Sequence, residues 1–300
     1  MVAPSSVDPR AVARVRRRLA AADEPPWLHR EVARRLAERL QVLRQPPGQW
    51  LDWGGFLGGG ASEVARVWPQ AQRVVVEPDA ELLARSRDAL RRPWWNWRGQ
   101  RAAEAAVVLE TDVAPAAAGM LFANMVWQAS DDPDALLRCW HRALAPRGVL
   151  MFATLGPDTL RELRTIYAAQ GWPAPHPPYV DMHDIGDALV QHGFDDPVMD
   201  QEVLRLSWSS PAALLAELRQ WGGNIAVTRF AGMRTRAWRH ALETSLSQAA
   251  DPQGRICMSI EVVYGHAVRG QHRAAVGEPV RVGLDELRSN LPSRRRLPNS

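Results

Sequence analysis

The sequence predicts an α/β protein built on a doubly wound, mostly parallel β-sheet. A glycine-rich stretch, residues 54–60, separates a short strand candidate from a helix candidate. A second strand candidate follows and ends in an acidic residue, Glu77. Strand and helix candidates then alternate to about residue 155, as they do in sheets whose parallel strands are joined by helices.

The first 48 residues are predicted to form an N-terminal helical segment. Hydrophobic residues recur at helical spacing over residues 12–19 and again over residues 28–43, with arginine and glutamate between them. Two prolines and a glycine at residues 46–48 are expected to end the second helix.

A sheet domain is predicted over residues 49–268. Its strands are expected at residues 50–53, 73–76, 107–109, 120–127 and 149–153, and its helices at residues 61–68, 80–90 and 134–143. Further helices are expected at residues 158–168, 183–192 and 212–221, and further strands at residues 198–208 and 255–267. Residues 269–300 are polar and arginine-rich and are predicted to form a flexible tail.

Composition narrows the possible functions. All 37 basic residues are arginines, so no lysine is present for a P-loop or a Schiff base. The net charge of +4 permits an acidic partner but does not indicate nucleic-acid binding. Two cysteines provide neither a disulfide framework nor a cysteine-rich metal site, and no metal is expected. No secretory signal or membrane span is recognised, so a cytoplasmic protein without a membrane partner is expected.

The glycine-rich stretch and Glu77 together are typical of a nucleoside site. Glycines let a ligand approach the N–H groups at a helix start, and a carboxylate ending the second strand accepts hydrogen bonds from ribose hydroxyls. Glu77 follows Gly54 by 23 residues, close to the spacing of such pairs. The alternative is a simple turn with a solvent-facing glutamate. Phe56 interrupts the pyrophosphate fingerprint, which favours S-adenosylmethionine over a nicotinamide dinucleotide and disfavours a dehydrogenase.

Several segments resemble a known family. Residues 51–54 with Glu77 resemble motif I and the following acidic position of class I S-adenosylmethionine-dependent methyltransferases. A narrower resemblance, to the biotin-pathway malonyl-acyl-carrier-protein O-methyltransferases, is carried by residues 124–128, 131–133, 144–152, 156–164 and 181–187. A related mitochondrial complex I assembly factor, regarded as an arginine hydroxylase, shares the general pattern. The resemblance covers roughly residues 11–225.

The resemblance implies a Rossmann-like fold with an antiparallel last strand, in which residues 198–208 pair with residues 255–267. It implies methyl transfer from S-adenosylmethionine to the free carboxylate of a malonyl thioester on acyl carrier protein. The cofactor-binding residues that it implies are Asp52, Gly54, Gly58, Glu77, Asp112 and Asn124. No catalytic residue is assigned, because a carboxylate is already nucleophilic at neutral pH.

Arg161, Arg164 and His183 are candidates for holding the substrate. Arginine suits a carboxylate because its guanidinium binds both oxygens at once. For each arginine alone, a solvated helix face is an equally good interpretation. For His183, between two aspartates at a helix start, helix capping is favoured over substrate binding.

Three departures from the family pattern leave a second function open. Phe56 replaces a motif I glycine, residues 118–121 lack the usual acidic and aromatic start of the fourth strand, and no tyrosine lies near residues 23–27. The second candidate is therefore a diverged, non-catalytic methyltransferase-like protein that acts as an assembly or regulatory partner. Either the glycines that follow Phe56 let the loop backbone shift and keep a usable pocket, or the Phe56 ring occupies cofactor space. The first alternative is favoured, and Phe56→Gly is expected to tighten cofactor binding.

Overall fold

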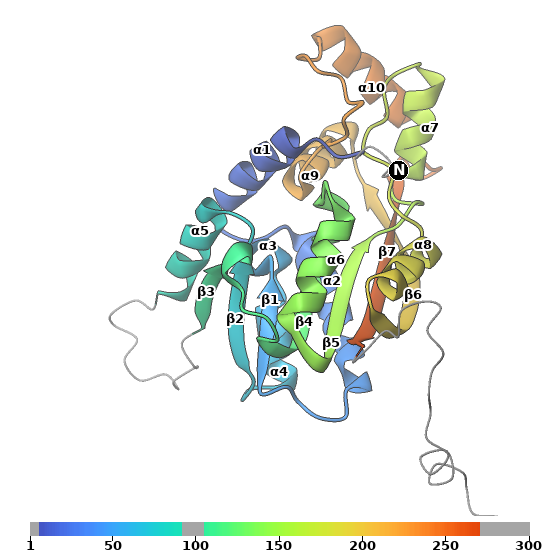
Figure 1. Cartoon of the computed structure of the whole chain (residues 1–300). Coiled ribbons are helices and arrows are strands. Elements are labelled where there is room, and N and C mark those ends of the chain that lie inside the picture. Colours follow the sequence, from blue (N-terminus) through green and yellow to red (C-terminus); the bar gives the residue numbers. More distant parts are fainter. Residues whose placement is uncertain (1–5, 92–104, 271–300) are drawn as a thin grey trace, which may run out of the picture. The chain divides into compact units, whose positions relative to one another are not determined.

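The computed structural model describes residues 6–91 and 105–270, and within them seven strands form one sheet in the order β3-β2-β1-β4-β5-β7-β6. The strands are β1 (Gln49–Trp53), β2 (Gln72–Glu77), β3 (Ala106–Leu109), β4 (Ala118–Asn124), β5 (Leu144–Leu155), β6 (Phe194–Trp208) and β7 (Ile256–Arg269). Strands β1 to β5 are parallel, and β7 lies antiparallel between β5 and β6 (Figure 1).

The predicted doubly wound sheet with an antiparallel last strand is therefore confirmed. The predicted pairing of the last two strands is also confirmed, with Val198 opposite His266 and Trp208 opposite Ile256. The predicted strand at residues 120–127 is too long. Strand β4 ends at Asn124 because Met125 has φ +58°, in the left-handed region, which breaks the extended backbone.

Helices precede, connect and follow the strands. They are α1 (Pro9–Ala20), α2 (Trp27–Glu38), α3 (Gly55–Gly58), α4 (Ala61–Val67), α5 (Ala80–Leu90), α6 (Pro133–Ala143), α7 (Arg161–Ala169), α8 (Met182–Gln191), α9 (Pro211–Trp221) and α10 (Arg236–Gln248). Short 3-10 turns are η1 (Arg39–Val42), η2 (Glu110–Asp112) and η3 (Trp127–Ala129). Aspartate side chains at residues 79 and 132 accept hydrogen bonds from the first turns of α5 and α6, which fixes where those helices begin.

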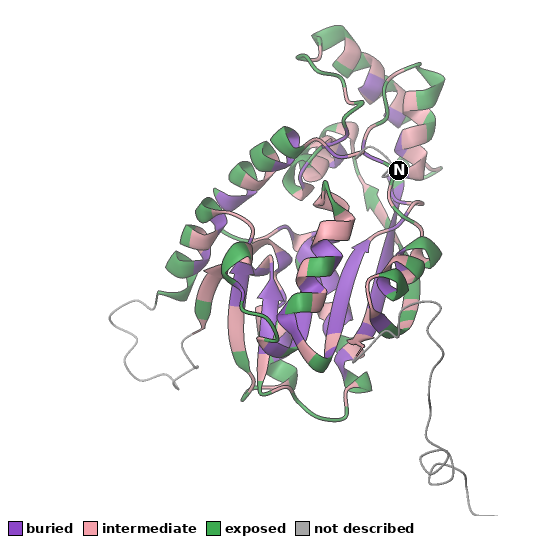
Figure 2. Ribbon diagram, viewed as in Figure 1, coloured by how far each residue is buried: buried purple, intermediate pink, exposed green. Residues whose placement is uncertain are grey.

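Two hydrophobic clusters cover the two faces of the sheet. Side chains alternate along a strand, so Met120 and Phe122 of β4 belong to one cluster while Leu121 and Ala123 belong to the other. Helix α2 packs on the first face and α6 on the second. Figure 2 shows the buried residues concentrated in the central strands.

The two N-terminal helices pack in different hydrophobic clusters. Helix α2 contributes Leu28, Val32 and Leu36 to the main core, whereas α1 packs in a small cluster with Ile225. The predicted boundary at residue 48 thus cuts through contacts of the main core. Residues 271–300, most of the predicted tail, lie outside the described residues.

The parallel strands all end at one edge of the sheet. Their last residues are Trp53, Glu77, Leu109, Asn124 and Leu155. Helices α1 and α9 lie beyond this edge (Figure 1). In open α/β sheets this carboxyl edge is where ligands bind.

Candidate functional site

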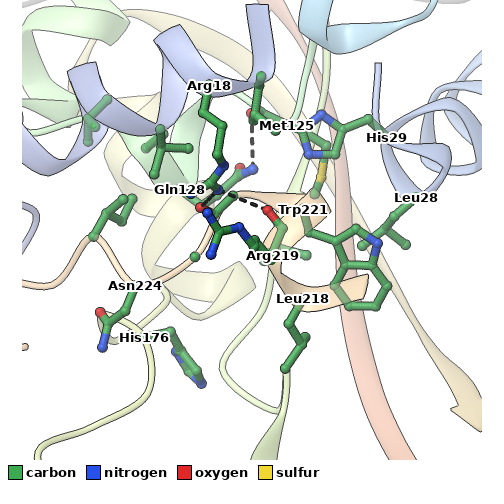
Figure 3. A pocket seen from close by; sticks show the side chains of 18 of the residues that line it. Arg18, Leu28, His29, Met125, Gln128, His176, Leu218, Arg219, Trp221 and Asn224 are labelled. Carbon is green, nitrogen blue, oxygen red and sulfur yellow. Dashed lines mark hydrogen bonds between the residues drawn. The ribbon is translucent and has the colours of Figure 1, made fainter. Parts of the chain in front are cut away.

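A cavity of about 600 Å³ lies at the carboxyl edge of the sheet. Gly54, Glu77 and Asn124 line it from the sheet side, and residues of α1, α7, α9 and α10 close it from the other side. Figure 3 shows Arg18 of α1, His29 of α2 and Trp221 of α9 gathered around this space. The volume is that of a small-molecule site.

Glu77 carries the clearest sign of a missing ligand. It is fully buried, and its Oε1 accepts hydrogen bonds from the Phe56 N–H (2.8 Å) and the Ser86 hydroxyl (2.6 Å). Its Oε2 is buried and has no hydrogen-bond partner among the described residues. Burial raises the pKa of Glu77 to about 7, and the nearby Asp52 carboxylate adds to this effect. The solvent-facing interpretation of Glu77 is wrong, and the cavity contains an acceptor that is left unused by the protein.

The glycine loop keeps Phe56 away from the cavity. Gly54 has φ +67°, which favours glycine, and its N–H donates to the Val76 carbonyl at 2.7 Å. The chain then makes the single helical turn α3, and the Arg85 guanidinium carbon lies 5.0 Å from the centre of the Phe56 ring. Phe56 does not line the cavity, so its ring takes no cofactor space.

Asn124 is fixed by two carbonyl groups. Its Nδ2 donates to the carbonyls of His29 and Gly58, both at 2.7 Å. These bonds orient the amide, and Oδ1 is left buried without a hydrogen-bond partner among the described residues. Asn124 lines the cavity, whereas Gly58 does not and instead holds Asn124 in place.

Asp52 is not brought to the cavity. Its buried carboxylate pairs with Arg73, whose Nε donates to Oδ2 at 2.8 Å. It lies behind the glycine loop, where a Cβ on Gly55 would come within 2.8 Å of its Oδ2. The structure gives Asp52 a supporting position beneath the loop rather than a place in the cavity wall.

The acidic residue that follows β3 in the cavity is Glu110, not Asp112. Glu110 accepts a hydrogen bond from the Trp53 indole N–H at 2.8 Å, and burial raises its pKa. Asp112 is exposed and does not line the cavity, because the turn η2 carries the chain away from the sheet edge. The signal that identifies Glu110 was present in the sequence, since it directly follows the end of the third strand.

The three predicted substrate-binding residues do not line the cavity. Arg161 pairs with Asp158 at 2.9 Å, and Arg164 is partly buried on α7. His183 is exposed, and its backbone N–H donates to Asp181 Oδ1 at 2.8 Å. The cap of α8 is therefore Asp181, and the interpretation that His183 itself caps this helix is wrong.

Other arginines reach the cavity instead. They are Arg16 and Arg18 on α1, Arg219 on α9 and Arg239 on α10. Arg18 also joins two elements, because its Nη2 donates to the carbonyls of Arg219 (2.9 Å) and Gly222. Periodicity alone could not find these residues, since the end of α1 and the start of α9 are 191 positions apart.

His29 presents a neutral imidazole to the cavity. Its Nδ1 lies 2.8 Å from the Leu57 carbonyl, which only accepts, so Nδ1 carries the hydrogen. Burial lowers its pKa to about 4. This residue was not predicted from the sequence.

Two features are absent from the described residues. Within residues 6–91 and 105–270, no group of three or more histidine, cysteine, aspartate or glutamate side chains is arranged to hold a metal ion. In the same ranges, no helix has the length and apolar character needed to cross a bilayer.

Comparison with known proteins places this geometry in context. Residues 27–196 match a family model described as a methyltransferase domain. A malonyl-[acyl-carrier protein] O-methyltransferase of Laribacter hongkongensis is 38% identical over 261 residues, which cover 84% of this chain and 86% of the relative. One of Gallionella capsiferriformans is 35% identical, covering 82% and 85%.

Solved structures share the fold at low identity. The YcgJ protein of Bacillus subtilis has a TM-score of 0.53 at 10% identity, covering 79% of this chain and 98% of that one. The [4+2]-cyclase SpnF has a TM-score of 0.50 at 16% identity, covering 90% and 98%. Because one of these proteins is named a cyclase, the fold alone does not define the reaction.

Proposed function

Because this chain belongs to the methyltransferase family, within the group of malonyl-[acyl-carrier protein] O-methyltransferases, we propose that it methylates the free carboxylate of a malonyl thioester on acyl carrier protein. The methyl donor is S-adenosylmethionine. The observation that carries this proposal is the buried Glu77 carboxylate, which lines the cavity with one oxygen unpartnered among the described residues.

The cavity residues fit the groups of the donor. Glu77 Oε2 is an acceptor suited to ribose hydroxyls, and Asn124 Oδ1 is an acceptor suited to the ammonium of the methionine end. Gly54 allows close approach to the loop backbone, and Gly58 holds Asn124. In this proposal Asp52 supports the loop, and Glu110 takes the place expected for Asp112 beside the base.

The protein's part in the reaction is positioning and exclusion of water. When bound, S-adenosylmethionine supplies an electrophilic methyl group on its sulfonium sulfur. Leu160, Leu163 and Tyr167 give the substrate side of the cavity a largely apolar wall. An apolar wall strips water from a carboxylate nucleophile and holds it in line with the donor, so no general base is required.

The arginines of the cavity complement an acidic partner. Arg18, Arg219 and Arg239 are solvent-exposed as well as cavity-lining, so they lie at the mouth. Positive charge at a mouth attracts an anionic substrate and its carrier, an effect that salt weakens.

The second candidate, a non-catalytic assembly or regulatory protein, rests on the altered glycine loop. Phe56 is the specific observation in its favour. The outward position of the Phe56 ring weakens it, because the cavity keeps its volume.

Methyl-transfer assays separate the two candidates. We expect the protein to convert malonyl-[acyl carrier protein] to its methyl ester with S-adenosylmethionine, and to leave acetyl-[acyl carrier protein], which has no free carboxylate, unchanged. Intact-protein mass spectrometry detects the added methyl group. Binding of the donor without methylation of the malonyl carrier would favour the non-catalytic candidate.

A further inference from the structure

His176 is a buried histidine in the cavity wall that has no role so far. Its side chain is 5% exposed, and it lies on the loop between α7 and α8. The ring stacks on Tyr179, with centroids 4.7 Å apart and planes 8° from parallel. It lines the same cavity as Glu77, whose wall also includes residues of α7, α9 and α10. Figure 3 shows the His176 side chain among those that line the cavity.

The hydrogen bonds of His176 define its tautomer. Nδ1 lies 2.7 Å from the Pro177 carbonyl, which only accepts, so Nδ1 carries the hydrogen. In the neutral ring Nε2 is then a bare acceptor. Nε2 is buried and has no hydrogen-bond partner among the described residues. A buried acceptor without a donor is unfavourable, and this cost is removed by a donor group or by a proton that arrives together with an acceptor.

The reacting end of the proposed substrate offers only acceptors. A malonyl thioester presents carboxylate oxygens and a carbonyl oxygen there. A neutral Nε2 repels these groups, whereas a protonated ring donates to them with a charge-assisted bond. Protonation and carboxylate binding therefore favour each other.

We propose that His176 binds the malonyl carboxylate, and that Nε2 takes up one proton as the carboxylate enters the cavity. The inference rests on the proposed function of the cavity. It assigns His176 as a substrate-binding residue that distinguishes the free acid from its methyl ester. During transfer a carboxylate oxygen forms the new bond to the methyl carbon, and the breaking S–C bond leaves its electron pair on sulfur. The Nε2 proton stays on the ring and returns to solvent when the neutral ester leaves.

The surroundings of His176 are suited to such a change. Burial holds the pKa of the free ring below its ordinary value, and the Arg164 guanidinium on α7 acts in the same direction. The Pro177 and Thr159 carbonyls act in the opposite direction. The other titratable side chains that line this side of the cavity are Tyr179, Tyr167, Arg219 and Arg239. The empty site thus favours a neutral ring, and an arriving carboxylate reverses that preference. Arg164, although outside the cavity wall, also attracts the carboxylate.

The proposal predicts a definite pH dependence. The protonated ring binds the substrate, and rising pH removes that form from the free protein. With saturating donor, kcat/KM for malonyl-[acyl carrier protein] is expected to decrease between pH 7 and 9, and the decrease should approach about tenfold for each pH unit. The rate constant kcat should change little, because the bound carboxylate keeps the ring protonated.

Calorimetry measures the proton directly. Malonyl-[acyl carrier protein] is titrated into the protein saturated with S-adenosylhomocysteine at pH 8, in two buffers of different ionisation enthalpy. The wild type is expected to take up about one proton more for the malonyl carrier than for its methyl ester. The ester corrects for protons exchanged where the carrier protein itself docks. Equal proton uptake for both ligands would overturn the proposal.

Two variants keep the test independent of folding. His176→Asn retains a donor for the Pro177 carbonyl but loses Nε2, and should raise KM about 10- to 100-fold and abolish the extra proton. His176→Gln offers an amide N–H near Nε2 that does not titrate, so binding should partly recover with a flat pH profile. His240→Gln, on an exposed histidine of α10, is the matched control and should behave as wild type. A sloping profile in His176→Gln would also overturn the proposal.

Failure of the underlying function has a different signature. If the wild type bound S-adenosylhomocysteine but neither the malonyl carrier nor its ester, the proposed substrate would be wrong. If it bound the malonyl carrier without the extra proton, only the role of His176 would be wrong.

Discussion

At the scale of single residues, the site is defined by polar atoms that the protein leaves unsatisfied. Glu77, Asn124 and His176 are each held by hydrogen bonds through one atom and leave a second buried atom without a partner among the described residues. Such atoms are rare in native proteins because each costs free energy. With the Trp238 Nε1, four such atoms belong to residues that line one cavity, which indicates that a polar ligand completes the site.

Glu77 should make stability depend on pH. Burial raises its pKa to about 7 from an ordinary 4.5, so the folded protein keeps a proton that the unfolded chain releases in this range. Its stabilising contribution is therefore fully present below pH 4.5 and is lost as pH rises through 7. As the pH rises from 4.5 to above 7, the unfolding free energy of the wild type should decrease by roughly 2–4 kcal/mol more than that of Glu77→Gln.

Urea unfolding of both proteins from pH 5 to 8 checks this. The quantity to compare is the difference in unfolding free energy between the two proteins at each pH. Burial lowers the pKa of His29 to about 4, so His29 makes stability rise with pH, and this effect is the same in both proteins. Glu81→Gln, on an exposed glutamate of α5, serves as control. Parallel pH profiles for wild type and Glu77→Gln would show that Glu77 is ionised throughout.

Phe56→Gly should not tighten donor binding, contrary to the expectation from sequence. The ring lies beside Arg85 outside the cavity, and the Phe56 N–H that reaches Glu77 belongs to the backbone. Removing the ring adds no ligand space and gives the loop more freedom, which disfavours the ordered state. Titration with S-adenosylhomocysteine is expected to give equal or weaker affinity. A clear gain would mean that the ring enters the cavity in solution.

At the scale of elements, α1 and α9 form the cover of the cavity although they lie far apart in the chain. Val7 pairs with Ala226, Asp8 forms an ion pair with Arg229, and Arg18 binds two carbonyls at the end of α9. The small cluster around Ile225 is separate from the two main clusters. Helix α9 is held in the main core by Leu214, whereas α1 joins the α9 end through this modest set of contacts, so α1 can loosen without disturbing the sheet.

Arg18→Ala should loosen this cover. We expect faster hydrogen exchange of the α1 amides and a loss of roughly 1 kcal/mol in S-adenosylhomocysteine binding, the size of one or two hydrogen bonds at a partly exposed site. Arg17→Ala is the matched control, because Arg17 is the exposed neighbour on the same helix and does not line the cavity. Identical exchange in both variants would show that Arg18 does not hold α1 in place.

The sequence could predict strands and helices better than it could predict which side chains meet. The helix at residues 80–90 coincides with α5, because Asp79 caps its start and its apolar residues keep the helical period. Helix α10 was not predicted, since its apolar positions are few and a glycine-rich region precedes it. The substrate side of the cavity was missed because it depends on contacts between α1, α7, α9 and α10, which local patterns do not contain.

At the scale of the whole molecule, the strand order explains where the site lies. The chain order reverses at β1, which has β2 on one side and β4 on the other. The crevice at such a switch point opens at the carboxyl ends of the strands, and Glu77 and Asn124 end the two strands that flank β1. This much was predictable, because the glycine loop and Glu77 mark the first βαβ unit in the sequence. The antiparallel pair β6 and β7 then closes the far side of the sheet.

Calorimetric titration of the wild type and Glu77→Ala with S-adenosylhomocysteine and with NAD tests the central claim most directly, namely that this cavity is an S-adenosylmethionine site held by Glu77. We predict that the wild type binds S-adenosylhomocysteine and does not bind NAD. Glu77→Ala should weaken binding by roughly 1–3 kcal/mol, the cost of losing a charge-assisted hydrogen bond. A folded wild type that binds no S-adenosylhomocysteine, or a variant with unchanged affinity, would contradict the claim.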